Sequence, residues 1–317
     1  MLEKLSIALC LIGLSTGSAS ARTVRIVIDA DAAPRVAFGV DRLVGALREI
    51  GHDATVVRSP SDSSDDMDCI AVGWMEQPHI RSLINSGRVQ PEPNGLGDEG
   101  FLLASCGRGT LAVIAGDDSG ALYGCLELAR RIQETGQLPV NLHFSDHPAF
   151  KLRGTCIAMQ KTYILPGRQE YEYPYTPELF PFFYDKAFWT EYLDSLAEKR
   201  MNMLCLWNGH PFASLVKLPE YPYALEVSEN QFERNVVMYR YIAEEADKRG
   251  IWLVQMFYSI LLSQPLAARH GLDTQLSAPT PLAADYTRKS IAEFVRQYPN
   301  VGLYVCLGEA MLDVEKQ

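Results

Sequence analysis

The first part of the chain alternates short runs of strand type with segments of helical periodicity. Residues 23–29 alternate apolar and polar side chains and are rich in β-branched types, which predicts a strand. Residues 38–50 carry apolar side chains at helical spacing and are followed by Gly51, which predicts a helix that ends at a glycine. The other predicted elements are strands over residues 53–57, 69–72, 100–105 and 110–115, and a helix over residues 118–134.

The last two of these strands are separated by Gly107-Arg108-Gly109, which predicts a hairpin turn. Asp118 or Ser119 is the expected cap of the helix that follows. A set of strands and helices of this kind can cover one layer with the other, so the pattern predicts a small α+β domain over residues 22–147.

From about residue 150 the pattern changes to a strict alternation of strand and helix. The predicted strands are residues 152–159, 203–207, 252–258 and 302–307, and the helices between them are 187–200, 231–249 and 283–297. The strands are nearly continuous apolar runs, as in a parallel sheet covered on both faces. This favours an α/β fold over residues 148–317.

Two parallel architectures fit this alternation. The long connecting segments follow the strands rather than precede them, which favours a (β/α) barrel with four of its strands present, because the loops after the strands form the functional face of a barrel. The alternative is an open doubly wound sheet. No Gly-rich dinucleotide motif follows any strand, which weakens that alternative.

The first 21 residues resemble a secretory signal. Lys4 is followed by an apolar run over residues 5–14, and small residues end at Ala19-Ser20-Ala21, a typical cleavage pattern. The alternative is a buried N-terminal helix. We therefore expect an exported protein, secreted or periplasmic, with no membrane insertion after removal of the signal, since no later segment has the pattern of a membrane span.

Composition narrows the range of partners. The chain has 317 residues and a formal net charge of −10, so an anionic nucleic acid is an unfavourable partner. The cysteines that follow residue 21 form no C-x-x-C pair, and the histidines form no H-x-x-H or H-E-x-x-H pair. The sequence therefore predicts neither a metal site nor a cofactor, and it leaves the oligomeric state open.

Glu309 is the strongest candidate for a catalytic residue. It lies just after the fourth predicted strand, where a carboxylate would project into the mouth of a barrel. Glycoside hydrolysis needs a protonated carboxylic acid at the leaving oxygen, and either a second carboxylate or a substrate group on the opposite side. The alternative is a glutamate placed at a helix start by the helix dipole.

The candidate substrate-binding residues lie around the same strands. Four of them have a structural alternative: an ion pair at the lower end of the barrel for Arg153, a core aromatic for Trp207 and for Tyr258, and a surface position for His210. The candidates are Arg153, Trp207, Asn208, His210, Tyr258 and Tyr163.

The segment 163–184 is rich in aromatic residues and contains four prolines. Prolines stiffen a loop, and aromatic rings stack on the C–H faces of sugars, so this segment is a candidate sugar platform that includes Tyr163. The alternative is packing of the segment against the N-terminal domain.

Three segments resemble a known group of enzymes. They are residues 99–131, which contain Ala-Gly-Asp-Asp-Ser-Gly-Ala-Leu-Tyr-Gly-Cys-Leu-Glu-Leu; residues 147–154, His-Pro-Ala-Phe-Lys-Leu-Arg-Gly; and residues 196–204, Leu-Ala-Glu-Lys-Arg-Met-Asn-Met-Leu. Their order and spacing are similar to the accessory domain and first barrel strands of family 20 β-hexosaminidases and family 67 α-glucuronidases.

The resemblance implies a non-catalytic accessory domain, a carbohydrate substrate, a general acid at Glu309 and a substrate contact at Arg153. One position departs from the hexosaminidases, which place an aspartate directly before the acid where this chain has Gly308. The departure argues against substrate-assisted hexosaminidase chemistry and leaves an α-glucuronidase-like or otherwise unassigned glycosidase.

Two main classes of function therefore remain open: an exported glycoside hydrolase or a fragment of one, and a carbohydrate-binding or scaffold protein of the same fold without catalysis. A third possibility is a non-glycosidase barrel enzyme, such as a lyase or an isomerase. Four barrel strands leave open sheet edges and apolar surface. We therefore expect residues 22–317 alone to be poorly stable and to have little activity unless another chain completes the barrel. The sugar, its linkage and the stereochemical outcome are not readable from these residues.

Overall fold

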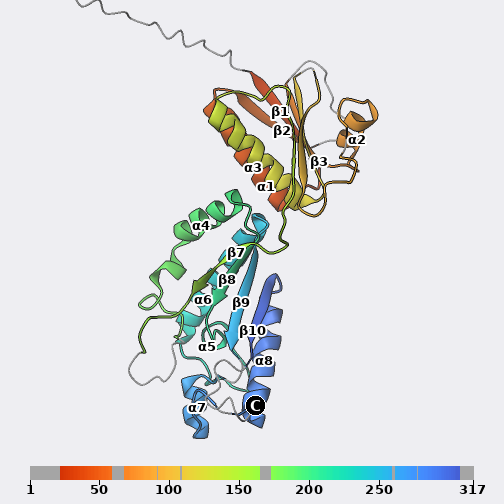
Figure 1. Cartoon of the computed structure of the whole chain (residues 1–317). Coiled ribbons are helices and arrows are strands. Elements are labelled where there is room, and N and C mark those ends of the chain that lie inside the picture. Colours follow the sequence, from red (N-terminus) through yellow and green to blue (C-terminus); the bar gives the residue numbers. More distant parts are fainter. Residues whose placement is uncertain are drawn as a thin grey trace, which may run out of the picture.

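The computed structural model describes residues 22–58, 68–90, 92–107, 109–164, 173–258, 261–276 and 278–307 (Figure 1). The predicted signal and Glu309 lie outside the described residues. The structure contains two separate sheets, one built from residues 23–146 and the other from residues 154–306. They correspond to the two patterns of the sequence, before and after about residue 150.

The first sheet has six strands and is mixed. Its strand order is β2-β1-β3-β5-β4-β6; β1, β2, β3 and β5 run parallel, and β4 is antiparallel to β5 and β6. The elements are β1 Thr23–Ile28, α1 Pro34–Glu49, β2 Asp53–Arg58, β3 Cys69–Trp74, α2 Pro78–Asn85, β4 Phe101–Ser105, β5 Thr110–Ala115, α3 Asp118–Thr135 and β6 His143–Asp146. The predicted hairpin is confirmed as β4 and β5.

Helices cover both faces of this sheet. Helices α1 and α3 pack side by side on one face (Figure 1), where a Cβ at Gly39 would lie 3.1 Å from the Cβ of Cys125. Glycine thus allows the two helices to approach closely. On the other face α2 packs Ile80 and Leu83 against Leu102 and Ile114. Sequence periodicity missed α2, which is only 8 residues long.

The cap of α3 differs from the prediction. The N-cap is Asp117 rather than Asp118 or Ser119: one carboxylate oxygen accepts from the Gly120 N–H at 2.8 Å, and the other accepts from the Glu99 N–H at 2.8 Å. One side chain therefore holds both the start of α3 and the turn before β4. An aspartate before a helix is a typical cap, so the sequence pattern is consistent with the contact to Gly120. The pattern does not indicate the contact to Glu99.

The second sheet has four parallel strands in the order β10-β9-β8-β7. The elements are β7 Gly154–Ala158, η1 Pro181–Tyr184, α4 Lys186–Glu198, β8 Met203–Trp207, α5 Phe212–Leu215, α6 Glu229–Lys248, β9 Trp252–Tyr258, α7 Gln264–His270, α8 Pro281–Gln297 and β10 Val301–Cys306. Neighbouring strands are consecutive in sequence, so the fold is the predicted α/β arrangement, a small N-terminal domain followed by part of a parallel barrel.

The two faces of this sheet differ. Leu204, Leu206 and Phe257 are fully buried under the helices. On the opposite face, Trp252 is 62% exposed and Tyr304 is 57% exposed. The expectation that both faces are buried therefore holds for only one of them among the described residues.

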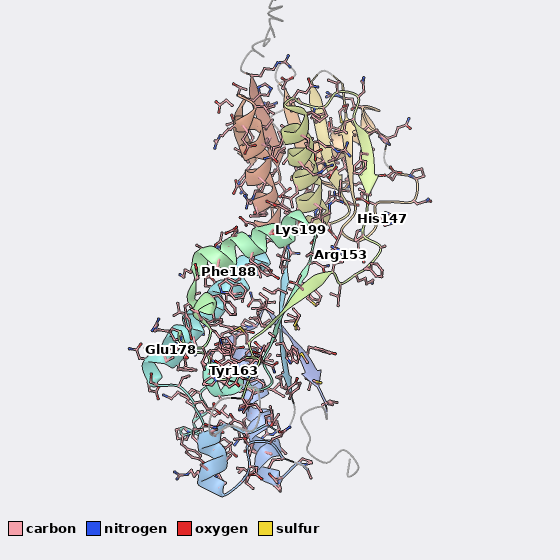
Figure 2. All side chains as sticks on the ribbon, turned by 60° about the vertical axis from the view of Figure 1, so that its left-hand side comes forward. His147, Arg153, Tyr163, Glu178, Phe188 and Lys199 are labelled. Atoms are coloured by element: carbon pink, nitrogen blue, oxygen red, sulfur yellow. The ribbon has the colours of Figure 1, made fainter. Side chains whose placement is uncertain are left out.

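The N-terminal domain rests on the amino ends of β7 and β8, as the labels of Arg153 and Lys199 in Figure 2 show. Arg200 bridges the domains, pairing with Glu127 at 2.8 Å and with Asp146 at 2.5 Å. Arg200 and Glu99 each have a φ of 56°. A left-handed conformation costs a residue other than glycine of order 1 kcal/mol or more, so the interface contacts hold these two residues against a local strain.

Candidate active site

The carboxyl ends of the four parallel strands meet at the end of the sheet that lies away from the N-terminal domain (Figure 1). The last residues of these strands are Ala158, Trp207, Tyr258 and Cys306. In parallel barrels this end carries the active site, because every loop that follows a strand begins there. Five of the sequence-predicted residues lie at or just after these ends: Tyr163, Trp207, Asn208, His210 and Tyr258.

Trp207 and Tyr258 form a direct pair. The indole Nε1–H of Trp207 donates to the hydroxyl oxygen of Tyr258 at 3.1 Å. Tyr258 is buried with Leu261, and the half-buried Trp207, Met256 and Cys306 pack against them. The hydrogen bond and the apolar bed fix the plane of the indole, while part of its surface remains accessible. A fixed, partly exposed aromatic ring is suited to contact with the C–H face of a sugar.

Asn208 has a positioning role. Its side chain is fully buried, and its Nδ2 donates to the carbonyl oxygens of Met159 at 3.0 Å and Tyr173 at 3.1 Å. Its Oδ1 accepts from the His210 N–H at 2.9 Å. The amide thereby ties the segment after β7 to the turn after β8. The structure shows this carboxamide bonded to backbone and not directed at an open surface.

His210 is buried rather than on the surface. Its Nε2 lies 3.2 Å from the hydroxyl of Tyr286, and its ring packs against those of Phe212 and Tyr286. Burial raises the pKa of Tyr286 above its usual range, so this phenol stays protonated and can donate to the imidazole. Tyr286 on α8 was not a candidate in the sequence, because it belongs to a helix 76 residues away.

The aromatic segment after β7 is mostly core. Tyr173, Tyr175, Phe180 and Phe183 are each at most 2% exposed. The Tyr175 ring packs edge-on against Phe183 at 5.0 Å between centroids. In the described part of this segment, these rings pack on the helices of the barrel itself. For these four residues the structure therefore corrects both sequence interpretations, the sugar platform and the surface packed on the N-terminal domain.

Tyr163 is the exception, with 56% of its surface exposed. Its carbonyl oxygen accepts a hydrogen bond from the Tyr173 hydroxyl, which anchors the backbone and leaves the Tyr163 ring open. Nearby, the ammonium of Lys161 lies 5.0 Å from the centre of the Phe180 ring. Lys161 was missed in the sequence, although a charged residue directly after a parallel strand could have marked it.

Arg153 lies at the opposite end of β7. Its guanidinium pairs with Glu99 at 2.6 Å and donates to the carbonyl oxygens of Arg200 and Phe150 at 2.8 and 2.7 Å. It also lies over the Tyr123 ring at 5.7 Å. The guanidinium is fully engaged where the two domains meet, which favours the structural ion pair over the substrate contact, so we leave Arg153 out of the site.

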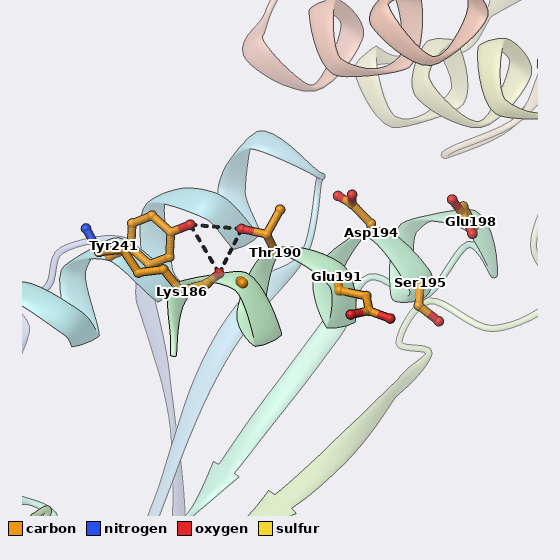
Figure 3. Close-up of a pocket in the computed structure, with 8 residues that line it drawn as sticks. Lys186, Thr190, Glu191, Asp194, Ser195, Glu198 and Tyr241 are labelled. Carbon is orange, nitrogen blue, oxygen red and sulfur yellow. Dashed lines mark hydrogen bonds between the residues drawn. The ribbon is translucent and has the colours of Figure 1, made fainter. Parts of the chain in front are cut away.

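A hollow lies outside the barrel along α4 (Figure 3). Thr190 Oγ1, the Tyr241 hydroxyl and the Lys186 carbonyl oxygen form a hydrogen-bonded group there, with Thr190 and Tyr241 2.9 Å apart. Asp194 is already paired with Arg249 at 2.6 Å and with Arg42 of the N-terminal domain. These contacts show that Thr190, Tyr241 and Asp194 take part in the packing between helices.

Within the described ranges, no three or more His, Cys, Asp and Glu side chains are grouped so that they could hold a metal ion. No helix in the same part of the chain combines the length and apolar character needed to cross a bilayer.

Comparison with known proteins agrees with this geometry. Residues 17–128 match the sequence model described as "Glycosyl hydrolase family 67 N-terminus". The chain resembles the solved structure of a family 138 glycoside hydrolase described as targeting pectin rhamnogalacturonan II, with 43% identity and a TM-score of 0.79. That match covers 92% of this chain but only 39% of the enzyme. No curated protein sequence matches the chain.

More distant structures share the fold. A family 115 4-O-methyl-α-glucuronidase with specificity for decorated arabinogalactans is 16% identical, with a TM-score of 0.51 and coverage of 89% of this chain and 35% of that one. The Flavobacterium johnsoniae chitobiase of family 20 is 15% identical, with a TM-score of 0.52 and coverage of 92% and 43%. The predicted resemblance to glycoside hydrolases of the family 67 and family 20 type is confirmed for the fold.

Proposed function

We propose that this chain provides the accessory domain and the first part of the catalytic barrel of an exported glycoside hydrolase. The observation that carries the proposal is the Trp207–Tyr258 pair at the carboxyl ends of adjacent parallel strands, in a chain 43% identical to a family 138 glycoside hydrolase. The fold alone would not support an activity, because one fold hosts many functions. The pair adds a surface with the chemistry of a sugar subsite.

Glu309 is the proposed general acid. It follows β10 by three residues, and a carboxylic acid at this position would protonate the glycosidic oxygen as the bond to the anomeric carbon breaks. Positive charge then develops on the sugar ring, and either a second carboxylate or a substrate group must stabilise it or activate water. Trp207 and Tyr163 would hold the sugar ring, while Asn208 and His210 fix the turn that carries Trp207.

The finer proposal is an α-glucuronidase-like preference for a uronic acid. The ammonium of Lys161, held over the Phe180 ring just beyond the end of β7, is a cation at the proposed mouth. A sugar carboxylate is a suitable partner for such a group. The family 138 relative, which is 43% identical, targets pectin rhamnogalacturonan II, so pectic oligosaccharides are the substrates to test first.

The test is the substitution Glu309→Gln in the protein encoded by the complete reading frame, assayed on pectic oligosaccharides. Loss of a general acid is expected to reduce kcat by about 10² to 10⁴ while leaving sugar binding intact. Glu233→Gln, an exposed position on α6, is the matched control and should leave kcat unchanged. Equal activity of Glu309→Gln and the parent would reject Glu309 as the acid.

The competing function is a carbohydrate-binding or scaffold protein of the same fold without catalysis. The Trp207–Tyr258 pair fits this function equally well, so the two are separated by turnover and binding measured on the same variant. No turnover by the parent together with saturable oligosaccharide binding would favour the binding protein. A β-hexosaminidase-like activity is the third candidate, and hydrolysis of aryl N-acetylglucosaminides would reveal it despite Gly308.

Export is the remaining part of the proposal. Its support is the apolar run over residues 5–14 followed by Ala19-Ser20-Ala21. Sequencing the N-terminus of the protein recovered from the periplasm or medium should give Arg22 as the first residue. An intact Met1 in a cytoplasmic fraction would contradict it.

A further inference from the structure

A second cavity lies in the N-terminal domain, at the end opposite to the barrel. It has a volume of about 460 Å³, in the size range of small-molecule sites. Its walls come from four places: the amino ends of β1 and β3, the turn between α1 and β2, the turn between β4 and β5, and the segment between α3 and β6. These segments meet only in the folded domain, so the sequence pattern gave no sign of the cavity.

His52 lies in the wall with an unused hydrogen-bonding capacity. It is only 9% exposed, and its Nδ1 has no hydrogen-bond partner among the described residues. A buried polar atom without a partner costs of order 1 kcal/mol or more, which a ligand hydroxyl could recover. Nδ1 itself is shielded in the structure, so a rotation of the ring about the Cβ–Cγ bond is needed to bring it to the cavity.

The charges around the cavity are balanced. Arg22 pairs with Asp68 at 3.1 Å, and the Asp68 side chain is 19% exposed. Gly109, with a φ of 72°, is what allows this carboxylate to approach the turn, since a Cβ there would lie 2.3 Å from Asp68 Oδ1. A compensated ion pair offers both donors and acceptors without a net charge, which disfavours an anion and suits hydroxyl groups.

The remaining wall is both polar and apolar. Gln137 and Asn141 bring carboxamides, which can donate and accept at once. Between them Val140 is 82% exposed and lines the same cavity with Leu138. Amide, imidazole and paired charges beside a small apolar surface match a sugar ring, which has hydroxyls at its edge and C–H groups on its face.

We infer that this cavity binds one neutral sugar unit, as an accessory site that holds the polysaccharide at a distance from the barrel. The inference does not depend on Glu309 or on turnover, because the cavity and the mouth of the barrel lie in different domains. If the catalytic proposal fails, the inference about this cavity therefore still stands. If the cavity binds no sugar, the catalytic proposal still stands.

The experiment is an NMR titration of the chain labelled with ¹³C-histidine, using D-galactose, L-rhamnose, L-arabinose and D-glucose as separate probes. The His52 signal is assigned by its loss in His52→Gln. We expect at least one sugar to shift this signal saturably at millimolar concentration, while the signal of the exposed His143 stays fixed. The His143→Gln variant serves as the control and should bind the same sugar equally well.

A second variant keeps the test independent of folding. Asn141 has a φ of 55°, so Asn141→Gly removes the carboxamide while keeping the left-handed backbone. We expect it to weaken the sugar affinity at least tenfold. Unshifted His52 signals with all four sugars, saturation by inorganic phosphate instead of a sugar, or full affinity in Asn141→Gly would each overturn the inference.

Discussion

The two ends of the parallel sheet are built from opposite chemistry. At the amino ends of β7 and β8, charged side chains meet across the domain interface, as in the Arg153–Glu99 pair at 2.6 Å and the Arg200–Glu127 pair at 2.8 Å. At the carboxyl ends, neutral aromatic and amide groups dominate, as in the Trp207–Tyr258 pair and the buried Asn208.

The direction of the strands thus separates the residues that stabilise the fold from those that are available for function. Groups at the amino ends are saturated by partners from the other domain and have little capacity left for a ligand. Groups at the carboxyl ends are fixed from behind but keep an accessible surface, as Trp207 does. In barrels the carboxyl end is the functional one. The following predictions test the separation, from the largest expected effect to the smallest.

The largest effect on stability is expected from Asn208→Ala at the carboxyl end. The change leaves the carbonyl oxygens of Met159 and Tyr173 without their buried donor, which should lower the free energy of unfolding by about 3 kcal/mol. Urea denaturation followed by circular dichroism measures it. The control is Asn300→Ala, whose exposed amide makes one long bond of 3.4 Å. Equal midpoints for the two variants would contradict the positioning role of Asn208.

At the amino end, Arg153→Ala is expected to lower the unfolding free energy by about 2 kcal/mol, because Glu99 then keeps a partly buried charge without its main partner. Sugar binding should not change. A double-mutant cycle with Glu99→Gln measures the coupling, and Arg288→Ala, with its exposed side chain, is the control. Weaker sugar binding at unchanged stability would restore Arg153 as a substrate residue.

Tyr258→Phe removes the hydroxyl that orients the Trp207 indole and keeps the ring. The unfolding free energy should fall by only about 1 kcal/mol, and oligosaccharide affinity should fall about threefold to tenfold. Isothermal titration calorimetry measures the second effect. Tyr304→Phe, on the exposed face of β10, is the matched control. The prediction fails if both variants lose affinity to the same extent.

The smallest effect concerns acid stability at the interface. Burial acts to raise the pKa of Glu127, but hydrogen bonds from Arg130 and Arg131 and the charge of Arg200 outweigh it, so the pKa is held below its usual value. The stabilisation is thus complete above a pH of about 4.5 and is lost as the pH falls through the lowered pKa. The free energy of unfolding should therefore decrease less on acidification in Glu127→Gln than in the parent. The difference should be less than about 1 kcal/mol in denaturation curves measured between pH 3 and 6. Glu233→Gln is the control, and identical pH profiles of the parent and Glu127→Gln would refute the effect.

Much of the fold was predictable because local periodicity encodes it. The strand–helix alternation gave β8, β9 and the three long helices of the barrel to within a few residues, and the glycine turn gave the hairpin. The short helices α2, α5 and α7 were missed, since 4 to 8 residues are too few to show a period of 3.6.

The site was predictable only in part. The rule that chemistry follows parallel strands found Trp207, Asn208 and Tyr258, but it could not separate a group that faces ligand from one that holds a turn. In the sequence, Asn208 and His210 stand at the end of the same strand as Trp207 and cannot be told apart from it by position. Only their buried hydrogen-bond partners show that they position the loop. Glu309 lies outside the described residues, so its role stays a prediction.

The sequence by itself determined the order of elements, the change from a mixed domain to parallel alternation, and the strands after which candidate residues stand, because these depend on neighbours a few positions apart. Only the tertiary structure decided that Arg153 joins the domains, that the aromatic segment forms core, and that His52 lines a cavity. These outcomes depend on contacts between residues tens of positions apart. No local pattern can encode such contacts, because burial and pairing are settled only when the distant segments pack together.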